Sequence, residues 1–480
     1  MIATLRRLGA SSSDIAGSFI WRVLAVALAV GLGVGAALIA RDLDPIVIAA
    51  DAVALLMIVA ILREPRIGPL TLVVVATVLP FAVVPLRVLV APTYLDLALA
   101  TTLVAWLARA LRDEQPIVRT PVDRLLLGFV GVIAVAAILG TALAPLNAAT
   151  LRLILKLVDS LLLFFSVTQL VRGSRAVYDV AQLLIASATL AALMALAVYA
   201  LPRSDAVAAL SSLNVLGYPT GEDVVRTVAG TDVVRATGTS VDPNVLGGML
   251  LLGTLLAGGV LLGARATRQR VALGAGVALM LAAIGLSGSR SAWVGLAAGV
   301  LYLGVFKQRR LLVASAIGGL ALLVTPPGQS MLGRLLQGVR AEDPATVMRL
   351  GEYRNALAII GEYPVFGIGF GGARDFDVGI GVSSAYLQVA ENVGLVGLGV
   401  FLLIVGATWW RLRRASRSLH FPNGGLIAGL QAALLGALVA GIFDHYFFNV
   451  RFPHMAALFW LLMALCVVAA REVVDEAPQE

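Results

Sequence analysis

The sequence is poor in cysteine, histidine and charge. Its one cysteine, Cys466, excludes a disulfide framework or a thiolate metal site within one chain. Charged residues make up 13% of the 480 residues and hydrophobic residues 60%, more apolar surface than a soluble domain can bury. No GxxxxGK[ST] phosphate loop is present, so nothing indicates an ATP-driven motor. These absences predict a polytopic membrane protein.

Apolar runs of bilayer-spanning length recur along the whole chain. We count about fourteen, which predicts an all-α bundle of about 12–14 transmembrane helices forming a single membrane domain over residues 1–480. The first run is too long for a signal-peptide core and is expected to be a retained helix. The runs lie near residues 19–40, 45–62, 68–86, 94–111, 125–145, 152–171, 178–201, 244–263, 271–286, 291–306, 311–325, 383–408, 424–442 and 453–470.

The basic residues are distributed unevenly between alternate loops. The net charge of +8 comes almost entirely from arginine, since Lys156 and Lys307 are the only lysines. The short even-numbered loops hold most of this charge, so the positive-inside rule places them and both termini in the cytoplasm. The basic pI then reflects topology and gives no reason to expect nucleic acid as a partner. The two long loops, about 202–243 and 326–382, are expected to be extracytoplasmic and to carry the functional site.

Arginines on the predicted outer side run against the positive-inside bias. Their planar forks bind phosphate or carboxylate in pairs of hydrogen bonds, although snorkelling to lipid phosphate is an alternative for each of them. We expect an anionic ligand chiefly at Arg235 and Arg290, because each of these two begins a structured motif. The outer arginines are Arg203, Arg226, Arg235, Arg290, Arg334, Arg340, Arg349, Arg354, Arg374 and Arg451.

Two of the motifs lie at predicted helix starts. In "RATGTSVDPNVLGG", Asp242 and Pro243 form an N-cap and first turn, so the helix should direct free N–H groups toward an anion beside Arg235. In "SGSRSAW", a Ser/Gly turn presents Arg290, with Trp293 at interface depth.

The third motif, "DPATVMRLGEYRNALAIIGEYPVFGIGFGG", predicts a helix that starts at Asp343 and ends before Pro364. Its apolar residues recur at helical spacing, which favours an amphipathic helix at the membrane surface. "GIGFGG" satisfies GxGxxG but follows a helix, so it favours close backbone packing or a lid over dinucleotide binding. Two DxD strings, at Asp42/Asp44 and Asp375/Asp377, leave a metal site as a weak alternative, and we expect no metal or cofactor.

Four strings in order, "RATGTSVDPN", "SGSRSAW", "RLGEYRNALAIIGEYPVFGIGFGG" and "SSAYLQVAENVGLVGLGVF", resemble the O-antigen ligase and O-antigen polymerase superfamily of bacterial envelope enzymes. The resemblance covers about residues 235–408. It implies a metal-independent glycosyltransferase of the bacterial inner membrane, with its active site facing outward. The implied partners are an undecaprenyl-diphosphate-linked glycan, an acceptor glycan, the lipid bilayer and other polysaccharide assembly proteins.

The resemblance also assigns roles to residues. Arg235 and Arg290 would bind the diphosphate, and we expect further substrate contacts from Arg349, Arg354, Arg374 and Arg451. Ligases of the family carry His-Asn-x-Tyr-Leu where this chain has "SSAYL", so Ser383 replaces their candidate base.

A serine is not a base unaided, so the acceptor hydroxyl needs another group. We therefore predict Asp444 and His445, in the "DHYFFN" string between the last two runs, as the base. An interfacial aromatic belt with a structural histidine is an equal alternative. His454 and Glu391 are weaker candidates.

The missing histidine favours a polymerase of exopolysaccharide or O-antigen repeat units over a ligase. The alternatives are a transporter or flippase of lipid-linked oligosaccharide and a non-catalytic envelope protein. A transporter should show midplane charges and a two-fold repeat. The sequence shows no clear repeat, and its only midplane charges are Lys156 and Asp159, which are expected to form an ion pair along one helix.

Overall fold

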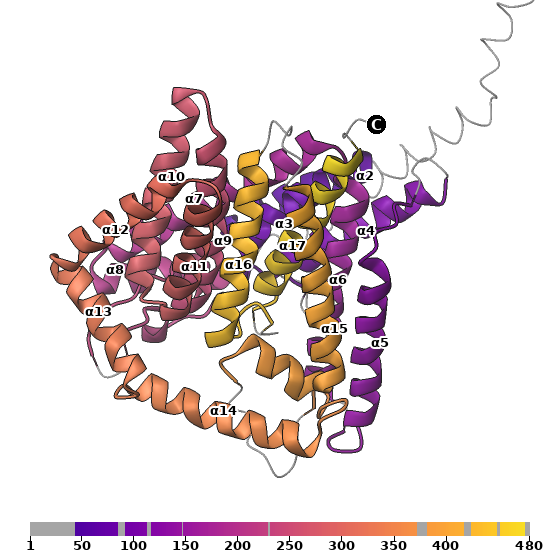
Figure 1. Ribbon diagram of the computed structural model, residues 1–480. Helices are drawn as coiled ribbons and strands as arrows, with labels where there is room; N and C mark the ends of the chain where they lie inside the picture. Colours follow the sequence, from indigo (N-terminus) through magenta and orange to yellow (C-terminus); the bar gives the residue numbers. More distant parts are fainter. Residues whose placement is uncertain are drawn as a thin grey trace, which may run out of the picture.

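The computed structural model describes residues 44–84, 92–112, 117–145, 147–228, 231–371, 382–416, 424–448 and 452–475. Regular structure in these ranges is helical, and the only β-type pairings there are two isolated bridges, Val83 to Thr93 and Thr227 to Val234. Figure 1 shows the helices as one bundle. The helices are α2 (Pro45–Arg63), α3 (Ile67–Val78), α4 (Tyr94–Ala110), α5 (Asp123–Gly140), α6 (Ala148–Leu170), α7 (Ser174–Tyr199), α8 (Arg203–Ser211), η3 (Ser212–Leu216), η4 (Glu222–Val224), η5 (Gly238–Ser240), α9 (Pro243–Gly263), α10 (Thr267–Ser287), α11 (Arg290–Phe306), α12 (Arg309–Leu323), α13 (Pro326–Val339), α14 (Pro344–Glu362), α15 (Ala385–Ala415), α16 (Gly424–Phe443) and α17 (Pro453–Asp475).

The predicted apolar runs correspond to helices. Every run from residue 45 onward falls on one, while the run at 19–40 lies outside the described residues. Within the described ranges, nine helices are long and apolar enough to cross a membrane, or ten if one bent pair counts as a span. The helix in the run at 68–86 is shorter than the run itself: α3 ends at Val78, because Pro80 cannot continue a helix. The all-α, polytopic membrane bundle is confirmed.

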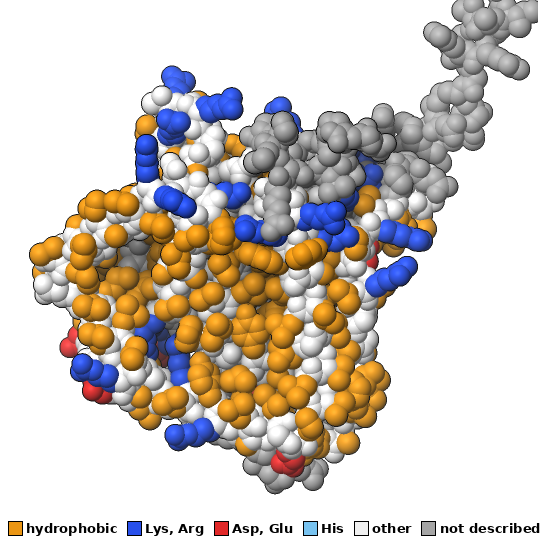
Figure 2. Space-filling view, viewed as in Figure 1, with side chains coloured by type: hydrophobic (Ala, Val, Ile, Leu, Met, Phe, Trp, Pro, Cys, Tyr) orange, Lys and Arg blue, Asp and Glu red, His pale blue; other side chains and the backbone are white. Residues whose placement is uncertain are grey.

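Basic residues gather at one end of the bundle, above a broad apolar band (Figure 2). Contacts join the short basic loops there: Arg109 forms an ion pair with Glu64 (3.8 Å) and donates to the Arg63 carbonyl. Arg413 donates to the Tyr302 hydroxyl at 3.1 Å. We call this end the basic end. Since α9 and α11 both run toward it, the residues that precede these helices lie at the opposite end.

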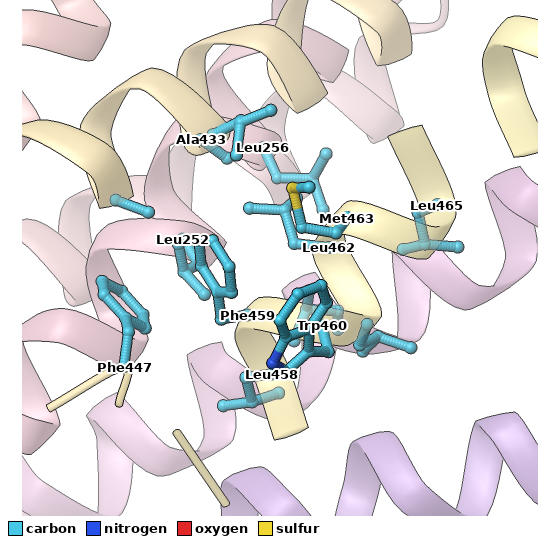
Figure 3. Packing of buried hydrophobic residues seen from close by; sticks show 14 of the residues in the cluster. Leu252, Leu256, Ala433, Phe447, Leu458, Phe459, Trp460, Leu462, Met463 and Leu465 are labelled. Carbon is cyan, nitrogen blue, oxygen red and sulfur yellow. The ribbon is translucent and has the colours of Figure 1, made fainter. Parts of the chain in front are cut away.

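The core joins α9, α16 and α17. Figure 3 shows Leu252, Leu256 and Ala433 beside Phe459 and Trp460, all of them almost fully buried. The backbones of α9 and α16 approach closely, since a Cβ on Gly259 would lie 2.2 Å from the Cα of Gly429. Small residues that permit such contact are typical of helix pairs in membranes.

An arm of two helices, α13 and α14, crosses the bundle end opposite the basic end (Figure 1). Asp343 caps α14 as predicted, with its side chain accepting from the Thr346 N–H. Glu352, Ala356 and Ile359 are buried on the inner side of α14. The outward-facing Leu357, which is 58% exposed, leaves an apolar surface free for the predicted contact with the membrane.

The glycine string "GIGFGG" closes a break in α15. Gly394, inside this helix, has a φ of 71° and interrupts the helical hydrogen bonding. Residues of the string satisfy the freed carbonyls: Ile368 donates to Glu391 (2.9 Å) and Gly369 to Asn392 (3.0 Å), while Leu395 donates back to Pro364 (2.7 Å). The interpretation as close backbone packing is therefore correct, and the backbone carbonyl of Glu391 takes part in it.

Replacing Gly394 with alanine is expected to destabilise the protein by about 2 kcal/mol or more. The new Cβ would meet the Val365 carbonyl oxygen at 2.0 Å, and a positive φ strains any residue with a Cβ. Thermal unfolding in detergent measures the effect. Gly399→Ala on the same helix is the control, because its Cβ would meet nothing within 4 Å. Equal melting temperatures for the two variants would contradict the packing described above.

Candidate functional site

A cavity of about 780 Å³ lies between the α13–α14 arm and the bundle. Four arginines line it, so we call it the arginine cavity. Figure 2 shows Lys or Arg side chains within a recess beside the arm. Its lining includes residues that the sequence predicted for the functional site and residues that it did not. The lining comprises Val228, Thr231, Val233, Arg235, Asn244, Gly288, Arg290, Ser330, Gly333, Arg334, Gln337, Glu342, Asp343, Pro344, Ala345, Met348, Arg349, Ser383, Asp444 and His445.

Six of the predicted site residues therefore share one cavity: Arg235, Arg290, Arg349, Ser383, Asp444 and His445. Arg354 does not line it and is exposed on α14. Arg374, Arg451, Asp42, Asp375 and Asp377 lie outside the described residues.

Arg235 is held by neutral oxygens. Its Nε donates to the Ser287 carbonyl (2.6 Å) and its Nη2 to the Asn244 side-chain oxygen (2.8 Å). Burial lowers the pKa of Arg235 to about 10, so the side chain is still charged at neutral pH. Neither hydrogen-bond partner carries a negative charge, and the nearby Asp242 and Asp444 carboxylates offset only part of the pKa lowering. The guanidinium charge is therefore incompletely balanced and can attract an anion.

The start of α9 differs from the prediction in one respect. Asp242 is the N-cap as predicted, but its Oδ1 itself accepts from the Asn244 and Val245 N–H groups (2.7 and 3.2 Å). The helix N-terminus therefore offers fewer free donors than the sequence indicated, since the cap already occupies them. Any attraction for an anion here comes mainly from Arg235.

Arg290 forms a two-pronged ion pair that the sequence did not reveal. Its Nη1 and Nη2 donate to the two carboxylate oxygens of Asp343, at 2.8 and 3.0 Å, and Nη1 also contacts the Thr346 hydroxyl at 3.2 Å. Hydrogen bonds from Arg290 lower the pKa of Asp343 to about 2. The first residue of α11 thereby fastens the start of α14 to the bundle.

Asp343→Asn is expected to loosen this attachment and to destabilise the protein by about 2 kcal/mol. Because the folded pKa is depressed, the contribution is fully present above the ordinary aspartate value of about 3.9 and is lost as the pH falls through the folded value. The melting difference from wild type should therefore be constant from about pH 5 to 8. Glu342→Gln, at an exposed neighbour, is the control. A difference that vanishes within this pH window would contradict the ion pair.

Asp444 and His445 lie on the wall of the cavity between α16 and α17. The Asp444 carboxylate accepts from Arg349 Nη2 (3.3 Å), the Ser291 hydroxyl (3.4 Å) and the His445 backbone N–H (2.9 Å). The His445 imidazole Nδ1 lies 3.8 Å from Asp444 Oδ1. With side chains 7% and 24% exposed, respectively, the carboxylate is buried and the imidazole is accessible from the cavity. Two residues outside the pair, Arg349 and Ser291, thus hold the Asp444 carboxylate beside His445.

Ser383 reaches the cavity at the entry to α15, where α14 positions its backbone. The Ser383 N–H donates to the buried Glu352 carboxylate (2.9 Å), and the Tyr353 hydroxyl donates to the Ser383 carbonyl (2.9 Å). Glu352 was missed from the sequence, because a glutamate in a surface helix ordinarily indicates a solvated face. His454, one of the two weaker candidates for the base, packs against the Phe81 ring at a centroid distance of 5.0 Å and does not line the cavity.

Within the described ranges, no three His, Cys, Asp or Glu residues lie close enough together to hold a metal ion. Asp44 of the first DxD string instead caps α2, accepting from the Ile46 N–H at 2.8 Å.

The fold and the apolar helices define an integral membrane protein of the all-α class. Residues 275–402 match a family model described as O-Antigen ligase. The match confirms the resemblance to the O-antigen ligase and polymerase superfamily, and it supports an activity of that type. It includes Arg290, Arg349 and Ser383, while Arg235 and Asp444 lie outside it.

No curated protein matches the chain. Among solved structures, a chain titled "Structural coordination of polymerization and crosslinking by a peptidoglycan synthase complex" is 17% identical, with 73% of this chain and 98% of that chain covered. Its TM-score of 0.37 is too low for any argument about this protein.

Proposed function

We propose that the protein is a membrane glycosyltransferase that polymerises or transfers undecaprenyl-diphosphate-linked oligosaccharide units on the outer face of the bacterial cytoplasmic membrane. The observation that carries the proposal is the arginine cavity. Cationic groups for a departing diphosphate and an acid–imidazole pair for a hydroxyl proton line the same space. Its volume of about 780 Å³ is within the range of small-ligand sites.

The chemistry follows from these groups. The acceptor hydroxyl oxygen attacks the anomeric carbon, while the bond from that carbon to the diphosphate oxygen breaks. The electron pair of this bond leaves with the diphosphate, whose charge the cavity arginines stabilise. The hydroxyl proton passes to His445, whose Nδ1 lies 3.8 Å from Asp444 Oδ1, or to Asp444 itself. The resemblance assigns diphosphate binding to Arg235 and Arg290, and both line the cavity.

A polymerase is favoured over a ligase within this proposal. Position 383 carries serine where ligases of the superfamily carry the histidine that is their candidate base. In this chain an imidazole reaches the cavity from His445 instead, on a different segment. A site with a differently placed base suits a different acceptor, namely a second lipid-linked oligosaccharide.

The orientation in the membrane is part of the proposal. The short basic loops lie at one end of the bundle and the arginine cavity at the other. By the positive-inside rule the basic end and both termini are cytoplasmic. The loops around 202–243 and 326–382, which contribute to the cavity, are then extracytoplasmic.

The test is glycan transfer by the purified protein in detergent, with an undecaprenyl-diphosphate-linked repeat unit as donor. A polymerase forms a ladder of glycan lengths on a gel and releases free undecaprenyl diphosphate without any added acceptor. A ligase forms a product only when a lipid A core acceptor is added, which would overturn the polymerase assignment. In sealed vesicles, donor translocation without a new glycosidic bond would identify a flippase and contradict the proposal.

A further inference from the structure

Arg334 of α13 reaches the same backbone turn as Arg235. A Cβ built on Gly288, in the "SGSR" turn, would lie 2.7 Å from Arg334 Nη1 and 3.5 Å from Arg235 Nε. These two nitrogens are therefore no farther apart than the sum of the two distances, a gap that one diphosphate group can bridge. The first nitrogen belongs to the arm and the second to the loop before η5, so guanidinium groups from two separate parts of the chain meet at this turn.

The four cavity arginines differ in how their charge is balanced. Arg290 is paired with Asp343, and Arg349 with Asp444. Within the described part of the chain, Arg334 lies within ion-pair distance of no carboxylate, and the hydrogen-bond partners of Arg235 are neutral. Burial is the largest cause that lowers the pKa of Arg235, and the charge of Arg334 lowers it further, while the nearby Asp242 and Asp444 carboxylates raise it. Like charges held together in a partly buried cavity are costly unless an anion lies between them.

Gly288 makes this close approach feasible. Its φ of 63° lies in the left-handed region, and the absence of a Cβ leaves the space that the Arg334 guanidinium occupies. The turn therefore brings together, without a steric obstacle, two arginines that form no ion pair within the described residues.

We propose that Arg334 and Arg235 together bind the diphosphate of the lipid-linked donor, while the ion pair of Arg290 with Asp343 holds the arm that carries Arg334. The identity of the ligand rests on the proposed function. Arg334 acts as a binding residue for the leaving group, and α13 is part of the donor site.

Binding of inorganic pyrophosphate, measured by thermal stabilisation in phospholipid-free detergent, tests the proposal without requiring turnover. Wild type should be stabilised by pyrophosphate more than by orthophosphate, and undecaprenyl diphosphate should have the same effect. Arg334→Gln should weaken pyrophosphate binding about 10-fold to 100-fold. Arg340→Gln is the matched control, since Arg340 is an exposed arginine at the end of the same helix and does not line the cavity. Arg334→Lys, which keeps the charge but not the fork, should show an intermediate loss.

Three results would overturn the proposal. They are wild-type pyrophosphate affinity in Arg334→Gln, equal losses in Arg334→Gln and Arg340→Gln, and equal stabilisation by phosphatidylglycerol, which would assign the site to a lipid headgroup phosphate. Failure of the proposed function is a separate outcome: pyrophosphate binding that depends on Arg334, in a protein that transfers no glycan, would leave the anion site standing and remove the reaction.

Discussion

Asp444→Asn is expected to lower the rate of glycan transfer about 10²-fold to 10⁴-fold, while donor affinity changes only a few-fold. Asparagine keeps the shape of the side chain but removes a negative charge 3.8 Å from the His445 imidazole, a charge that would stabilise the imidazolium during proton transfer. It also leaves Arg349, whose Nη2 lies 3.3 Å from the carboxylate, without its anionic partner. The measurement is single-turnover transfer at saturating donor.

Glu222→Gln serves as the control for Asp444→Asn. Glu222 is a carboxylate of the 202–243 loop that is ion-paired with Arg203 at 3.2 Å and does not line the cavity. His445→Ala, measured in parallel, assigns the proton. If His445 accepts it, both site variants lose activity, whereas a loss confined to Asp444→Asn makes the carboxylate the base. Wild-type transfer by Asp444→Asn would remove this pair from the mechanism.

Arg235→Gln should reduce the transfer rate at limiting donor about 10²-fold to 10³-fold, since it removes a fixed cation from the departing diphosphate. The side chain is positioned by the Ser287 carbonyl and the Asn244 amide oxygen, while the Arg235 backbone is held separately through its own N–H. The matched control is Arg226→Gln. Arg226 is exposed on the adjacent segment, and its carbonyl accepts from the Arg235 N–H at 2.8 Å.

The pH dependence of donor affinity gives a second measurement on Arg235. The guanidinium attracts an anion only when protonated, so affinity is full below its pKa and declines as the pH rises through about 10. Between about pH 6 and 8 affinity should therefore be flat with respect to this group. Equal donor affinities in wild type and Arg235→Gln would contradict its role.

The helices were predictable because a bilayer requires long apolar runs whose backbone groups bond internally. Local signals were equally informative where they depend on adjacent residues. The caps at Asp242 and Asp343 and the start of α14 agree with the sequence pattern. Hydropathy alone did not predict where α3 ends. Pro80 ends this helix well before the apolar run at 68–86 is over.

The site was predictable as a set of residues and not as a set of pairs. Arg235, Arg290 and Arg349 were predicted as site residues because they lie on the predicted outer side, where the positive-inside rule disfavours arginine. The partners of two of them depend on chain segments that meet only in the folded bundle: Arg290 and Asp343 are 53 positions apart, and Arg349 and Asp444 are 95 apart. No local pattern specifies such contacts.

The same reason applies to Glu352 and Arg334. Glu352 belongs to a surface helix by pattern, but it is buried because α14 packs on the entry to α15 and supplies the acceptor for the Ser383 N–H. Arg334 carried the same signal as the other outer arginines. What distinguishes it is the lack of a carboxylate partner within the described residues and its approach to Gly288, both of which require the tertiary structure.

Diphosphate binding in the arginine cavity is tested most directly by a structure of the protein in a lipid nanodisc with the undecaprenyl-diphosphate-linked oligosaccharide bound. We expect diphosphate density between Arg235 and Arg334, with the first sugar toward Asp444 and His445 and the lipid tail in the bilayer. Diphosphate density at the basic end of the bundle, or donor bound with both arginines turned away from it, would show that the arginine cavity is not the donor site.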